Sequence, residues 1–76
     1  MGVGIMYIDI LLKNHDADRN HFMRQTGFSH KKISKLNKQD PNSYSEELIK
    51  EIAQFLNLSY DNTRNELRQI NEKGTL

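Results

Sequence analysis

Apolar side chains recur at spacings of three and four residues along most of this chain, which is the periodicity of helices that bury one face. Strict alternation of apolar and polar residues, the pattern of a half-buried strand, never extends beyond three or four positions. The sequence also contains no Asn-Gly or Asp-Gly pair, the dipeptides that favour tight hairpins. The pattern therefore predicts an all-α protein.

Short breaks divide the periodic pattern into five predicted helices. These span about residues 5–15, 18–26, 29–38, 45–56 and 59–71. Asp18, Ser29 and Ser59 are suited to begin helices, because their side-chain oxygens can accept a hydrogen bond from a free backbone N–H. Gly27 and Asn57 are suited to the left-handed position after a helix. Pro41 lies in the turn-rich segment QDPNSYS and is expected to forbid further helix there.

The apolar positions of the five helices predict one small core, and we interpret residues 1–76 as a single domain. The fourth helix has the widest apolar face and is the expected core helix. In the fifth helix, residues 60, 63, 67 and 70 have the spacing of a coiled-coil seam, although Thr63 interrupts it. We expect this face to pack mainly into the core, with part of it left for a second subunit.

The net charge of +1 conceals an uneven distribution along the chain. Residues 1–18 carry −2, residues 19–38 carry +6 without a single acid, and residues 39–76 carry −3. A basic block of this kind within a folded chain is typical of a surface that binds a polyanion.

The segment GFSHKKISKLNKQ, residues 27–39, contains the third helix and most of the basic block. Only Ile33 and Leu36 can attach this helix to the protein, because they form a narrow apolar stripe. The opposite side of the helix is polar and cationic, and we therefore predict that this helix enters the major groove of DNA, which admits one α-helix. On this interpretation the base-reading residues are His30, Lys31, Ser34 and Lys35, and phosphates are contacted by Arg19, Ser29, Lys32 and Lys38.

The segments HFMRQTGFSHKKISKLNKQ and SEELIKEIAQFLNLSYDN resemble the lambda-repressor and Cro-like (XRE-type) helix-turn-helix family, over about Tyr7 to Leu67. The resemblance implies a small five-helix DNA-binding domain. It also implies that Gly27 is the turn residue, that Ile33 and Leu36 are the anchors, and that the four base-reading positions fall on the residues named above. Two positions depart from the family: Met23 replaces the usual Ala, and Thr63 replaces a common Leu.

We therefore expect a sequence-specific regulator that binds double-stranded DNA in the cytoplasm. A repressor is favoured over an activator because the chain has no room for a sensory domain. A homodimer is expected, formed in solution or only on DNA, because pairing places two recognition helices in successive major grooves. Two alternatives stay open. The chain could be a helical adaptor or antitoxin-like protein that binds another protein through its acidic last third or through the fourth and fifth helices. It could also be the DNA-binding part of a longer regulator or recombinase.

Other classes of function lack their signatures in the sequence. Without cysteine there is no disulfide and no thiolate zinc site, and the spacing of His15, Asp16, Asp18 and His21 fits no known metal motif. Catalytic motifs are absent, so we expect no enzyme, cofactor, metal or small-molecule ligand. No apolar run approaches the length that spans a bilayer, and the first residues lack the features of a signal peptide.

Overall fold

The computed structural model describes residues 6–73, and within this range the chain is entirely helical and contains no strand. The helices are α1 (Tyr7–Asn14), α2 (Arg19–Thr26), α3 (His30–Lys38), the short 3-10 helix η1 (Pro41–Ser43), α4 (Glu46–Leu56) and α5 (Tyr60–Lys73). The all-α prediction is confirmed. The predicted start of the first helix at residue 5 lies outside the described residues, and the last helix continues two residues beyond its predicted end.

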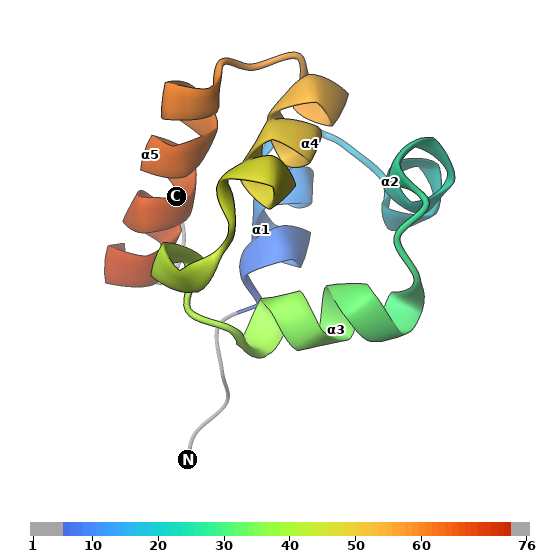
Figure 1. The fold of residues 1–76 in the computed structure, drawn as a ribbon, viewed down its shortest axis with the longest axis horizontal. Helices are drawn as coiled ribbons and strands as arrows, with labels where there is room; N and C mark the ends of the chain where they lie inside the picture. Colours follow the sequence, from blue (N-terminus) through green and yellow to red (C-terminus); the bar gives the residue numbers. More distant parts are fainter. Residues whose placement is uncertain (1–5, 74–76) are drawn as a thin grey trace.

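Four of the helices form the body of the molecule, and α3 lies across one end of it (Figure 1). The C-terminal helix α5 packs against both α4 and α1, and α2 packs against α4. Helix α3 contacts α1 and is otherwise placed at the edge of the body. Helix α3 is therefore attached to the body of the molecule along one side only.

Local sequence signals account for most helix ends. The hydroxyl oxygens of Ser29, Ser45 and Ser59 each accept a hydrogen bond of 3.1 Å from the backbone N–H three residues later. Gly27 ends α2 with φ +81°, and Asn57 ends α4 with φ +59°, so both residues adopt the left-handed conformation predicted for them.

Two local predictions hold only in part. Asp18 occupies the N-cap position of α2, but its side chain makes no capping hydrogen bond. Pro41 does not exclude helix from its loop, because it begins the 3-10 helix η1. Proline is compatible with a first helical position, where its missing N–H would have had no helical partner, and the Asp40 carboxylate accepts from Asn42 N at 2.9 Å to close the turn.

The core is a single cluster to which every α-helix contributes. Its centre contains Phe22, which contacts Phe28 and Phe55 edge-on at ring-centre distances of 5.3 and 4.9 Å. The other buried apolar side chains are Ile8, Leu11, Leu12, Ile33, Leu36, Tyr44, Ile49, Ile52, Ala53, Leu67 and Ile70. Because Phe28 lies between α2 and α3, this aromatic contact fixes the turn that connects these two helices.

Helix α5 uses its apolar face for the core. Leu67 and Ile70 are buried, and Thr63 is 0% exposed, with its hydroxyl donating to the Ser59 carbonyl at 3.0 Å. Thr63 therefore does not leave a gap in the packing of this helix. Only Tyr60 of the four seam positions keeps partial exposure, so the expected free portion of this face is limited to that residue.

The loop between α3 and α4 is tied to α3 by Tyr44. Its buried hydroxyl donates to the Leu36 carbonyl at 2.6 Å, and so satisfies one of the carbonyls that the end of a helix leaves free. Burial, with smaller contributions from Tyr7 and Asp40, raises the pKa of Tyr44 well above its ordinary value. None of the helices in residues 6–73 has the length and apolar character needed to cross a membrane.

Candidate functional site

Helix α3 is divided into a buried side and a solvent side. Ile33 and Leu36 are 0% and 5% exposed, and full burial of two such side chains contributes roughly 3–6 kcal/mol to holding the helix in place. His30, Lys31, Ser34 and Lys35 are all exposed, and their spacing puts them on one side of the helix. We call these four residues the α3 outer face. They project from a helix whose opposite side is buried against the body of the molecule.

The residues predicted to contact phosphates surround the α3 outer face, but three of the four already have partners. Ser29 uses its oxygen to cap α3. Lys32 places its ammonium 4.1 Å from the centre of the Phe28 ring, a cation–π contact that directs the side chain over the turn. Lys38 is exposed at the end of the helix. Ser29 keeps its hydroxyl hydrogen for donation, and Lys32 can leave an exposed contact of this strength at small cost.

Arg19, at the start of α2, is held by an acid that sequence reasoning did not connect with it. Its Nε donates to Asp9 Oδ1 at 3.1 Å, and its Nη2 forms an ion pair with Asp9 Oδ2. The two side chains are 30% and 27% exposed, so the pair is partly shielded from water. The third guanidinium nitrogen, Nη1, lies 3.5 Å from His30 Nδ1. Arg19 thus connects α1 to the first residue of the α3 outer face.

Asn37, a polar residue on the buried side of α3, supplies a second connection that was not predicted. It is 3% exposed, and its Oδ1 accepts hydrogen bonds from the backbone N–H groups of Ile8 and Asp9 at 2.8 and 3.2 Å. Its Nδ2 donates to Asp9 Oδ2 at 3.1 Å. Met6, in the N-cap position of α1, makes no side-chain cap bond. Asn37 therefore caps α1 from 28 to 29 residues away.

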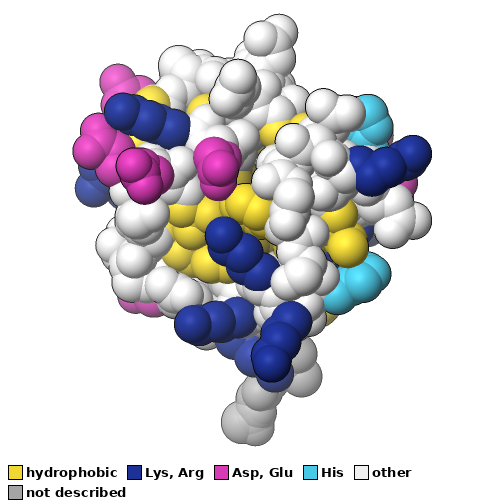
Figure 2. Space-filling model, turned by 45° about the vertical axis from the view of Figure 1, so that its right-hand side comes forward, with side chains coloured by type: hydrophobic (Ala, Val, Ile, Leu, Met, Phe, Trp, Pro, Cys, Tyr) yellow, Lys and Arg dark blue, Asp and Glu magenta, His cyan; other side chains and the backbone are white. Residues whose placement is uncertain are grey.

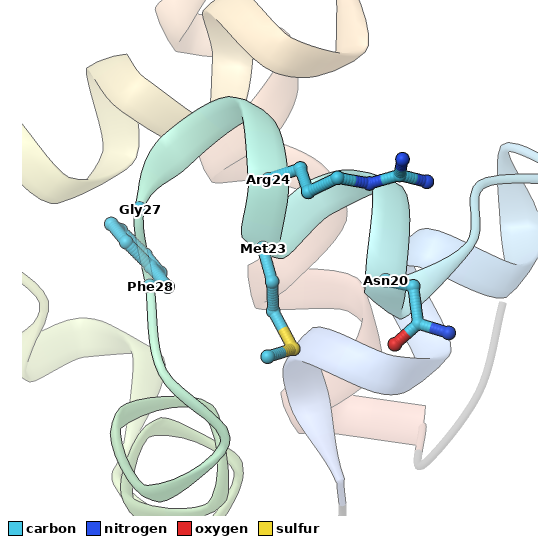
Figure 3. Close-up of a pocket in the computed structure, with 5 residues that line it drawn as sticks. All are labelled: Asn20, Met23, Arg24, Gly27 and Phe28. Carbon is cyan, nitrogen blue, oxygen red and sulfur yellow. The ribbon is translucent and has the colours of Figure 1, made fainter.

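Met23, one of the two residues that depart from the resembled family, faces the space beside the turn. It is partly buried against the core and lines a hollow of about 490 Å³ with Asn20, Arg24, Gly27 and Phe28. Figure 3 shows the Met23 and Asn20 side chains extending downward from α2, whereas the Arg24 side chain extends to the right, above Asn20. The flexible thioether fills only part of this space, and the hollow stays open to solvent.

The charges on the described surface are unevenly distributed. Figure 2 shows a group of lysine and arginine side chains at the centre and bottom of the view, with further cations at the upper left and the right, and most of the acidic side chains at the upper left. Lys31, Lys32, Lys35 and Lys38 of α3 are all exposed. Their positive charges favour the approach of a polyanion to α3.

The two histidines near the ends of α1 and α2 make other contacts. His15 Nε2 lies 2.6 Å from Glu66 Oε1 and joins the end of α1 to α5, while the His21 ring lies 5.4 Å from that of Phe55. Among the described residues, no group of three or more histidines and acids has a geometry that could hold a metal ion.

Comparison with known protein families matches residues 7–61 to the family described as "Cro/C1-type HTH DNA-binding domain". This range contains α1 to α4 and therefore the whole of the α2–turn–α3 unit. No match was found among curated proteins or among solved structures.

Proposed function

Because the chain belongs to the Cro/C1-type helix-turn-helix family of DNA-binding domains, we propose that it is a sequence-specific transcriptional regulator that reads the major groove with α3. The observation that carries the proposal is the division of α3. Its apolar stripe is buried, whereas all four residues of the outer face are exposed on a helix at the edge of the body. A helix attached in this way can enter a groove without any rearrangement of the core.

In this proposal the residues have two kinds of task. His30, Lys31, Ser34 and Lys35 contact base edges, where the pattern of donors and acceptors distinguishes the base pairs. Arg19, Ser29, Lys32 and Lys38 contact phosphates and fix the position of α3 along the duplex. The absence of acids from residues 19–38 supports this division, since no acid of the block opposes the approach of the backbone.

We further propose a homodimer that acts as a repressor. The molecule measures 33 × 26 × 23 Å, dimensions that allow two adjoining copies to present their α3 helices one turn of DNA apart, about 34 Å. Residues 63, 67 and 70 of the predicted seam on α5 are buried in the core. Another surface must therefore join the two copies, either in solution or on DNA. Repression follows if the dimer occupies a promoter, because blocking access requires no contact beyond those with DNA.

The proposal is tested by selecting bound duplexes from random DNA and then measuring affinity for a selected and a scrambled duplex at several salt concentrations. If Arg19, Lys32 and Lys38 each neutralise one phosphate, the logarithm of the affinity falls with the logarithm of the salt concentration with a slope of about −3. Lys38→Ala should weaken binding to both duplexes equally, whereas Lys35→Ala should weaken binding mainly to the selected one.

Glu72→Gln, on the exposed side of α5, is the control and should leave discrimination between the two duplexes unchanged. Equal losses on both duplexes in the Lys35 and Lys38 variants would contradict the assignment of roles. If the protein retains no duplex in a salt-sensitive manner, DNA recognition itself is refuted, and the adaptor or antitoxin-like interpretation takes its place.

A further inference from the structure

We propose that Asp9 of α1 is a positioning residue for DNA recognition, which reduces general attraction to DNA and increases discrimination between sequences. The inference rests on the proposed function. The inference goes beyond that function by assigning a role at the DNA interface to an acidic residue of α1, a helix to which the proposed function gives no contact with DNA.

The Asp9 carboxylate holds the guanidinium of Arg19 through two of its nitrogens. Bidentate pairing of this kind fixes the plane of the guanidinium as well as its position. A free arginine at a helix start would sample many rotamers and could follow any nearby phosphate. With Nε and Nη2 occupied, the remaining donor edge at Nη1 is held in one direction, toward the start of α3.

The carboxylate is itself held in place. Asp9 Oδ2 accepts from Asn37 Nδ2, and the backbone N–H of Asp9 donates to Asn37 Oδ1, so Asn37 contacts Asp9 at two points. Asn37 is buried and belongs to α3. The direction of Arg19 is thus set relative to the recognition helix, and the hydrogen bonds between Arg19, Asp9 and Asn37 join α2, α1 and α3 at one place.

The consequence for base reading arises at His30. Arginine can only donate hydrogen bonds, so the approach of Nη1 to His30 Nδ1 at 3.5 Å makes Nδ1 the acceptor and leaves the ring hydrogen on Nε2. The ring nitrogen left for DNA is then a donor. We infer that His30 selects a base edge that offers an acceptor, such as N7 or O6 of guanine.

The negative charge of Asp9 has the opposite effect on general affinity. The basic block of residues 19–38 has no acid of its own, but folding brings this carboxylate against its first cation. A carboxylate beside a phosphate-contacting arginine weakens the attraction for any duplex. Asp9 therefore opposes non-specific binding while it orders the groups that read sequence.

Asp9→Asn tests both effects, because it removes the charge and keeps the size of the side chain. We expect affinity for a scrambled duplex to rise about two- to fivefold at low salt, as Coulomb attraction over several ångströms of water-like medium implies. The ratio of selected to scrambled affinity should fall about tenfold, which is the discrimination that one well-placed base contact provides. Asp18→Asn is the matched control, since it makes the same change beside Arg19 at a side chain that does not cap α2.

Asp9→Glu separates position from charge. It should leave non-specific affinity within about twofold of that of the original protein, since the charge is kept. It should still reduce discrimination, because the longer side chain moves the carboxylate. In the free protein, NMR should show slow exchange of the Arg19 Nε–H, and this protection should be lost in Asp9→Asn but kept in Asp18→Asn.

Three results would overturn the proposal. One is an equal rise of both affinities in Asp9→Asn and Asp18→Asn, which indicates bulk charge alone. Another is a parallel fall of both affinities in step with the melting temperature, which indicates a purely structural role. The third is unchanged discrimination in Asp9→Glu together with rapid exchange of the Arg19 Nε–H in the original protein. Failure of the original protein to prefer its selected duplex would instead refute the proposed function.

Discussion

Asn37→Ala provides the sharpest test of how α3 is attached to the body. In the original protein Asn37 Oδ1 accepts from Ile8 N and Asp9 N, and no local residue caps α1 with its side chain. Alanine leaves both donors without this partner. Since each buried donor left unsatisfied costs about 1–3 kcal/mol, and Asp9 N is only part-buried, we expect a loss of about 2 kcal/mol in the free energy of unfolding.

A loss of this size is easily measured in so small a domain. It corresponds to a fall in melting temperature of about 8–16 °C, because 1 kcal/mol shifts the midpoint by about 4–8 °C at this chain length. Urea unfolding followed by circular dichroism gives the free energy directly. Asn65→Ala, the same change at an exposed position of α5, is the control and should alter stability by less than about 0.5 kcal/mol. Equal stability of the two variants would refute the claim that Asn37 caps α1.

Three further predictions concern single residues. Tyr44→Phe should cost about 1 kcal/mol in urea unfolding at neutral pH, since the Leu36 carbonyl loses its donor. Because folding raises the pKa of Tyr44, the stabilising effect of its hydroxyl is complete below about pH 10 and is lost as the pH rises further. The original protein and the Tyr44→Phe variant should therefore converge in stability above about pH 10. A constant difference in stability up to about pH 11 would contradict this expectation. Gly27→Ala should cost about 1–2 kcal/mol of stability in thermal unfolding, because φ is +81° at this position, although the added methyl group meets no atom. Gly27→Asn should cost less, because asparagine tolerates the left-handed conformation better. Equal costs of the two variants would exclude backbone strain as the cause. Ser45→Ala should lower the melting temperature through loss of about 1 kcal/mol of capping energy, and an unchanged midpoint would show that water replaces the cap.

The sequence alone determined those features in which the interacting groups lie within a few residues of one another. The helical class follows from the spacing of apolar residues, and the ends of α2, α3 and α4 follow from Gly27, Ser29 and Asn57. The division of α3 into a buried stripe and a cationic side also follows from spacing, because the 3.6-residue period leaves little choice of face. These interactions act within one helical turn, so the local sequence contains both partners.

Tertiary structure alone decided which polar groups meet across the chain. Asp9 and Arg19 are 10 residues apart, and Asn37 caps a helix that begins about 30 residues before it. Nothing in the sequence distinguishes Asn37 from the asparagines that are exposed. Thr63, a polar interruption of an apolar face, has a local partner in the Ser59 carbonyl, but its full burial depends on the packing of α5 against α4 and α1. A polar side chain gains a buried partner only when packing brings that partner within about 3 Å, and this depends on how whole helices are placed rather than on neighbouring residues.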